Sequence, residues 1–139
     1  DEEFAVLQRH LDGFDPRDLA AAGVRPVASA ADLAAARAGV SRVSVAPEVT
    51  AYVVDLVRAT RTSPSLRLGV SPRGAVALIG AARAWAWLSG RDYVSPDDVK
   101  ALARPALRHR VSLRPEAELE GVTADAVLEG ILATVPTPR

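Results

Sequence analysis

Gly69-Val70-Ser71-Pro72-Arg73-Gly74 begins the stretch of sequence that decides the fold, because a long apolar run follows it directly. Ser71 is a favourable helix N-cap and proline is preferred at the first helical position, so a helix is expected to begin at Pro72. Apolar side chains are spread almost all round this helix, with Leu78, Trp85 and Leu88 on one face. Such a pattern predicts a helix that is buried between other elements.

Arg73 is the unusual residue of this stretch, because the first turn of a helix carries a partial positive charge. A cation at this place is disfavoured by up to about 1 kcal/mol. Free backbone N–H groups beside a guanidinium would make a strong anion site. A guanidinium that points into water would instead be screened, and the cost would be negligible. The stretch taken alone leaves both interpretations open.

The composition indicates one small helical domain. The chain has 139 residues, of which 49% are hydrophobic and only 4% aromatic. This length suffices for one domain with its own core, and an abundance of alanine favours closely packed helices. The 17 basic residues balance the 17 acidic ones, so the formal net charge is zero. This balance argues against a general binder of nucleic acid or of membrane surfaces, and neither partner is expected.

The supply of reactive and metal-binding side chains is small. Cysteine is absent, which excludes disulfides and thiol chemistry, and only His10 and His109 remain as soft ligands. We therefore expect no metal site. No run approaches the roughly 18 apolar residues of a membrane span, and the acidic N-terminus is unlike a signal peptide, so a cytoplasmic protein is expected. The chain begins at Asp1 in helix-like sequence, which suggests a fragment of a longer protein.

Helical spacing of the apolar residues predicts one helix, a linker and then a bundle of about four core helices. The expected helices cover residues 1–11, 30–38, 47–62, 72–88, 96–107 and a last segment capped by Thr123. Residues 14–29 have no sustained period and predict the linker, whereas Leu33 should face inward and Gly39 should end its helix. Residues 42–45 should be extended, 63–70 a loop and 112–121 a loop or short hairpin. Short connections favour antiparallel neighbours, so the fold class is an all-α small helical bundle.

The remaining polar clusters have structural explanations. Ser95 begins a capping-box pattern with Asp98 three residues later, and this accounts better for the carboxylates of Asp97 and Asp98 than an acid–base pair does. Pro105 should kink or limit its helix. His109 is expected at a helix end, where a cation suits the dipole, as a cap or surface residue.

Motifs of self-sufficient enzymes are absent from the sequence. It contains no phosphate-binding loop of the Gly-x-x-x-x-Gly-Lys-Ser/Thr type, no Gly-x-Ser-x-Gly elbow and no Cys/His dyad. Trp85 and Trp87 cannot share one helix face, so they indicate core packing or docking against a neighbouring domain better than a platform for stacking bases. The chain alone is not expected to be an active enzyme.

Four segments together resemble one known family. In order, they are Val57-Arg58-Ala59-Thr60-Arg61, Leu66 to Gly74, Gly90 to Val99, and Leu107-Arg108-His109-Arg110-Val111. Their order and spacing are similar to the lid of a MoxR-type AAA+ ATPase, and the likeness is dense from Val43 to Leu132.

The resemblance implies a fold and a role for particular residues. It implies that residues 1–29 are the end of a Rossmann-like ATPase core with its linker, and that residues 30–139 are the helical lid. Arg73 falls on the family's sensor 2 arginine, which reaches the γ-phosphate of ATP, and Ser71-Pro72-Arg73 would then belong to the nucleotide site. ATP and Mg²⁺ would be bound mostly by the core, whose Walker motifs must lie upstream.

The resemblance also implies partners. These are the chain's own AAA+ core, further copies in a homo-oligomeric ring, and an unknown client protein on which a chaperone-like motor acts. Arg61 and Arg67 could face a neighbouring subunit or simply be solvated. Two other functions remain open on the sequence: a helical protein-interaction or regulatory bundle with no nucleotide role, and a helical DNA-binding module.

Overall fold

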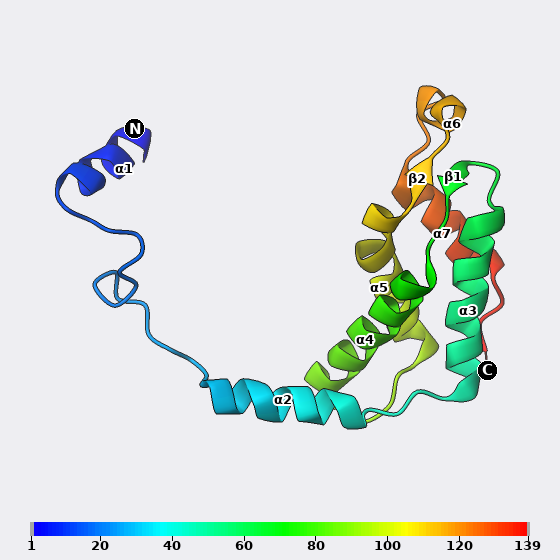
Figure 1. Cartoon of the computed structure of the whole chain (residues 1–139), viewed down its shortest axis with the longest axis horizontal. Helices are drawn as coiled ribbons and strands as arrows, with labels where there is room; N and C mark the ends of the chain where they lie inside the picture. Colours follow the sequence, from blue (N-terminus) through cyan, green and yellow to red (C-terminus); the bar gives the residue numbers. More distant parts are fainter. Residues whose placement is uncertain (1, 139) are drawn as a thin grey trace. The chain divides into compact units, whose positions relative to one another are not determined.

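The computed structural model describes residues 2–138, which are mainly helical (Figure 1). The helices are α1 (Glu2–Leu11), α2 (Ala30–Arg42), α3 (Pro47–Thr62), α4 (Pro72–Leu88), α5 (Pro96–Leu107), α6 (Pro115–Leu119) and α7 (Ala124–Thr134). One 3₁₀ turn, η1 (Arg108–Arg110), and the short strands β1 (Leu66–Leu68) and β2 (Ser112–Leu113) complete the elements. The predicted all-α class is confirmed.

The chain divides after Ala35 into two units. The first holds α1, a segment of turns and the beginning of α2. The apolar stripe of α1 forms as predicted, but Phe4, Leu7 and Leu11 are 64–79% exposed. Leu33 was expected to face inward, and this is wrong: its side chain is 53% exposed, because the first half of α2 buries nothing.

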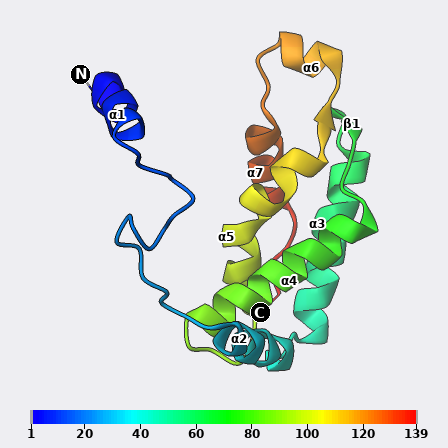
Figure 2. The ribbon, with the colours of Figure 1, turned by 60° about the vertical axis from the view of Figure 1, so that its left-hand side comes forward.

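The second unit, from Ala36 onward, contains the hydrophobic core. Helices α3, α4, α5 and α7 build it: α4 packs against α3 and α5, and α7 packs against the same two helices (Figures 1 and 2). Its largest fully buried side chains include Leu56, Leu78 and Leu107, one from each of α3, α4 and α5. Each helix buries one stripe at helical spacing, as the sequence predicted for α3 and α5.

Helix α4 differs from the expectation of burial on nearly all sides. Its buried face is formed by Gly74, Leu78, Ala82 and Ala86, at a spacing of four residues. The bulky residues Val76, Trp85 and Leu88 are instead 72%, 48% and 71% exposed. Small residues on the buried face of α4 let α3 and α5 pack close to it, and the larger side chains of α4 lie on its exposed faces. The prediction of burial nearly all round is therefore wrong: of Leu78, Trp85 and Leu88, only Leu78 is buried.

Residues distant in sequence form the small sheet. β1 pairs antiparallel with β2, with Leu66 opposite Leu113, so the segment predicted as a loop contains a strand. β2 and the short helix α6 occupy the segment predicted as a loop or hairpin, and α6 lies beside the sheet (Figure 2). The helices among residues 2–138 all lack the length and apolar character needed to cross a membrane.

The segment after α2 is tied to the far end of α4. The N–H of Ser44 donates to Asp92 O at 2.8 Å, and the N–H of Val94 donates to Ser44 O at 3.0 Å. Arg83 of α4 donates through Nε to Val43 O at 3.0 Å. Helix α2 continues past Gly39, where it was predicted to end, and the missing Cβ at Gly39 leaves room for the Trp87 indole.

Candidate functional site

Ser71, Pro72 and Arg73 all lie exposed at the start of α4. Ser71 occupies the N-cap position and Pro72 the first helical position, as predicted. The Ser71 side chain makes no capping hydrogen bond, however. Instead its carbonyl oxygen accepts from the N–H of Gly74 at 2.9 Å and of Ala75 at 3.3 Å. The Ser71 hydroxyl is therefore available to a ligand or to water.

The donors at this helix start have few partners within the chain. Pro72 has no N–H, and the backbone N–H of Arg73 donates to no group among residues 2–138. The Arg73 guanidinium likewise forms no hydrogen bond or ion pair with any described residue. A free N–H, a hydroxyl and a guanidinium at the positive end of a helix dipole form a donor set suited to an anion.

Both backbone polar groups of Val70, three residues before Arg73, are held by α3. The N–H of Val70 donates to Thr60 Oγ1 at 2.9 Å, and the Thr60 hydroxyl donates to Val57 O at 2.6 Å. The carbonyl oxygen of Val70 accepts from Arg61 Nε at 2.8 Å. Val70 is fully buried and Thr60 is 1% exposed. The loop that leads into the site is therefore pinned to the last turn of α3.

The two glycines that flank the motif permit close packing. A Cβ on Gly69 would lie 2.7 Å from the backbone of Arg61, so only glycine allows the loop to run this close to α3. A Cβ on Gly74 would overlap the Val70 side chain and lie 3.4 Å from Arg110 Cδ. The sequence between the glycines is therefore held against α3 on one side and the end of α5 on the other.

Three arginines surround the start of α4. Arg61 comes from α3, Arg73 from α4 and Arg110 from η1, where its Nε donates to Ala106 O at 3.2 Å. The ion pairs that the structure describes use other arginines: Arg58, Arg91, Arg104 and Arg108. The expectation that Arg61 is simply solvated or faces another subunit missed its bond to Val70, since no local pattern predicts that contact. Arg67 lies exposed on β1.

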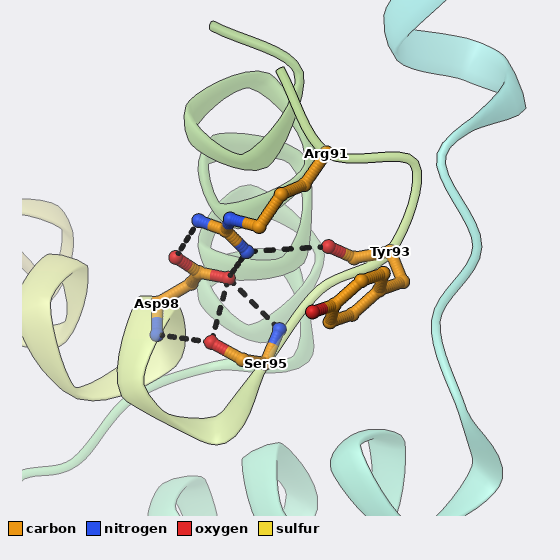
Figure 3. Close-up of polar contacts among 4 residues, drawn as sticks. All are labelled: Arg91, Tyr93, Ser95 and Asp98. Atoms are coloured by element: carbon orange, nitrogen blue, oxygen red, sulfur yellow. Dashed lines mark hydrogen bonds and ion pairs between the residues drawn. The ribbon is translucent and has the colours of Figure 1, made fainter. Parts of the chain in front are cut away.

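A separate polar cluster ties the connection between α4 and α5 to the first turn of α5 (Figure 3). Arg91 donates to both carboxylate oxygens of Asp98, from NH1 to Oδ2 and from NH2 to Oδ1, each at 2.6 Å. The N–H of Ser95 donates to Asp98 Oδ2 at 2.8 Å, and the N–H of Asp98 donates to Ser95 Oγ at 3.2 Å, which completes the capping box. The capping interpretation of Asp98 is confirmed, and Arg91 is a partner that the sequence did not reveal.

The electrostatics of this cluster favour the ionised carboxylate. Hydrogen bonds from Arg91 and Ser95 outweigh the desolvation of the 4% exposed Asp98 and lower its pKa from 3.8 to about 2. The hydrogen bonds to Asp98 in turn raise the pKa of Arg91. Asp98 is thus a structural anion with its charge neutralised, and it is unsuited to proton transfer near neutral pH.

A family model identifies this arrangement. The AAA lid domain model matches residues 58–131, which is more than half of the chain. The chain belongs to the AAA lid domain family. The match runs from α3 to α7 and so includes the pinned loop, the start of α4 and the Arg91–Asp98 cluster.

Proteins named MoxR are among the known relatives of the chain. The chain is 43% identical over 115 residues to YeaC, an uncharacterized protein of Bacillus subtilis, which covers 83% of the chain and 36% of YeaC. It is 39% identical over 106 residues to the protein MoxR of Paracoccus denitrificans, covering 66% of the chain and 31% of MoxR. It is 37% identical over 97 residues to the chaperone MoxR1 of Mycobacterium tuberculosis, covering 63% of the chain and 26% of MoxR1.

A solved structure has the same fold. A candidate ATPase from Cytophaga hutchinsonii matches with a TM-score of 0.79 and 30% identity, over 99% of this chain and 43% of that one. The MoxR-type resemblance seen in the sequence is confirmed. The AAA lid chain spans about a third of the length of the curated relatives it matches. The division at residues 29 and 30 into core end and lid stays a prediction.

Proposed function

We propose that this chain is the nucleotide-sensing lid of a MoxR-type AAA+ ATPase, in which Arg73 contacts the γ-phosphate of ATP. The observation that carries the proposal is the placement of Arg73: exposed, without an ionic partner among the described residues, and held at the positive end of α4. Because Arg73 is exposed, water screens its conflict with the helix dipole, but the unpaired guanidinium and the free N–H of Arg73 remain open to an anion. The family assignment supports a nucleotide phosphate as that anion.

The donor set fits a phosphate and does not fit a metal ion. Arg73 offers guanidinium donors, the backbone N–H of Arg73 is free and Ser71 offers a hydroxyl, while Pro72 fixes the turn. No cluster of three or more carboxylates or histidines that could hold a cation occurs among residues 2–138. In this proposal Mg²⁺ is therefore held by an AAA+ core, and Ser71, Pro72 and Arg73 form the lid's share of the ATP site.

Arg73 would act by electrostatics and by position. Bound ATP supplies the phosphoryl group, and the guanidinium donates to its terminal oxygens and neutralises charge that develops there. When those oxygens leave, Arg73 loses its bonds to the nucleotide, and the lid is held to it less strongly. The same side chain thereby couples hydrolysis to a hinge-type movement of the lid.

The wider role follows from the family and is part of the proposal. The partners are the AAA+ core, further copies in a homo-oligomeric ring, and a client protein acted on by a chaperone-like motor in the cytoplasm; nucleic acid and membranes are not partners. A helical interaction bundle without a nucleotide role and a DNA-binding module are the alternatives. Strongly salt-dependent binding of duplex DNA would favour the latter.

The test is steady-state ATP hydrolysis by the protein that carries this lid together with its core. Arg73→Ala should lower hydrolysis by about tenfold or more, equivalent to roughly 1.4 kcal/mol of transition-state stabilisation, with unchanged folding. Arg58→Ala is the matched control, because Arg58 is also exposed and its 3.8 Å pair with Asp55 is solvated. Equal hydrolysis and ATP binding in wild type and Arg73→Ala would refute the role of Arg73.

A further inference from the structure

We propose that Thr60 and Arg61 are positioning residues for Arg73, because together they hold Val70 by both of its backbone polar groups. The inference rests on the proposed function, since it concerns how the phosphate contact of Arg73 is kept in place. It gives the Ala59-Thr60-Arg61 segment of α3 a role that is distinct from contact with the nucleotide.

The hydrogen bonds of Val70 with Thr60 and Arg61, called the pin below, hold the start of α4, which lacks a side-chain cap. Ser71 does not cap the helix and Pro72 donates no hydrogen bond. The nearest side-chain hydrogen bonds to the preceding backbone are at Val70, whose N–H donates to Thr60 Oγ1 and whose carbonyl oxygen accepts from Arg61 Nε. Contacts with the last turn of α3 therefore set the position of the first turn of α4.

The pin is specific in its chemistry. Thr60 Oγ1 accepts from Val70 N and donates to Val57 O, so one buried hydroxyl serves two backbone groups. Valine has nearly the same shape as threonine, but it would leave the buried N–H of Val70 without an acceptor. Arg61 donates from Nε to the Val70 carbonyl oxygen, and Arg61→Ala removes that donor.

Close backbone packing makes any relaxation of the pin reach Arg73. Gly69 lies so near α3 that a Cβ there would be 2.7 Å from Arg61 Cα, and Gly74 packs directly on the Val70 side chain. A loop that loses its bonds to Thr60 or Arg61 would shift away from α3 and carry the first turn of α4 with it. A displacement of about 1 Å at a positioning group can lower catalysis substantially.

The experiment is a double-mutant cycle on ATP hydrolysis by the protein that carries the lid and its core. The variants are Thr60→Val, Arg61→Ala and Arg73→Ala, alone and in pairs with Arg73→Ala. Thr60→Val and Arg61→Ala should each lower kcat at least about threefold, and neither should lower it further once Arg73 is alanine. Thr60→Ser keeps the hydroxyl and should restore kcat to within about twofold of wild type.

Two controls separate positioning from loss of stability. Thr62→Val removes an exposed hydroxyl whose only described bonds, at 3.4 and 3.3 Å, lie within α3, and it should leave kcat unchanged. Arg61 is exposed, so Arg61→Ala tests the pin even where the buried Thr60→Val substitution impairs folding. Hydrogen exchange of the Val70 amide should accelerate in Thr60→Val and remain slow in Thr62→Val.

The outcomes distinguish this inference from the proposed function. A large loss in Arg73→Ala, with smaller non-additive losses in Thr60→Val and Arg61→Ala, supports the pin. A large loss in Arg73→Ala with no loss, or fully additive losses, in the other two overturns the pin alone. No loss in Arg73→Ala overturns the proposed function and this inference with it.

Discussion

The bond between Arg91 and Asp98 should make the stability of the helical bundle depend on pH in a defined range. Asp98 is 4% exposed, and the Arg91 and Ser95 hydrogen bonds lower its pKa from 3.8 to about 2. At about 1.4 kcal/mol per pKa unit, this difference contributes about 2 kcal/mol to the free energy of unfolding at neutral pH. The folded-state pKa is the lower one, so the contribution is complete above about pH 4 and is lost as pH falls toward 2.

The perturbation that isolates this contribution is Asp98→Asn, which keeps the shape and removes the charge. Urea unfolding, followed by circular dichroism at several pH values from 7 to 2, gives the free energy of unfolding of both proteins. We expect Asp98→Asn to be less stable by about 2 kcal/mol at pH 7 and nearly equal to wild type at pH 2. Other carboxylates titrate in both proteins and cancel in the difference.

Asp97→Asn is the matched control, because Asp97 is the neighbouring carboxylate in the first turn of α5 and is exposed. It should change the free energy of unfolding by no more than about 0.5 kcal/mol at any pH. A difference between wild type and Asp98→Asn that stays constant from pH 7 to 2 would refute the linkage. So would a loss of equal size in Asp97→Asn.

Two further predictions concern packing. Gly80→Ala should raise the free energy of unfolding by about 0.5–1 kcal/mol, because nothing lies near the position of its Cβ. Gly39→Ala should not raise the free energy of unfolding and should shift the tryptophan emission, because its Cβ would overlap the Trp87 indole. An equal rise in both variants would contradict the contact between Gly39 and Trp87. Tyr52→Phe should leave stability unchanged or raise it by up to about 1 kcal/mol in the same urea assay, because the buried Tyr52 hydroxyl forms no hydrogen bond of good geometry among residues 2–138. Burial raises the pKa of Tyr52 more than its weak contact with Thr137 lowers it. A clear loss of stability in Tyr52→Phe would show that the hydroxyl is satisfied.

Features set by local chemistry could be predicted from the sequence. The N-cap positions of Ser71 and Ser95 and the capping box of Asp98 depend on residues within one turn, and all three are found where they were expected. The same applies to the buried stripes of α3 and α5, because helical spacing alone selects one face of an amphipathic helix. Arg73 was singled out for the same reason, since its conflict with the dipole is visible in a few residues.

Features that depend on distant neighbours could not be predicted. In α4 the sequence favoured burial of Trp85 and Leu88, but the face that packs against the neighbouring helices is that of Gly74 and Ala82. The bonds from Arg91 to Asp98 and from Arg61 to Val70 have no periodic signal, because loops bring these residues together. Hydrophobicity describes a side chain alone, whereas burial also depends on how much room the partner leaves.

These contacts make α4 a helix held at both ends through the backbone of its neighbours. At its start, α3 pins Val70, and near its other end Arg83 donates to the carbonyl oxygens of Ser41 and Val43. Its 17 residues span about 25 Å at 1.5 Å per residue. Ala82 and the other small residues of the buried face pack tightly in the middle of α4, so the helix moves as one rigid unit. In the proposed function, such a frame would keep the backbone that carries Arg73 in place, so little backbone order would have to be gained when its guanidinium meets a phosphate.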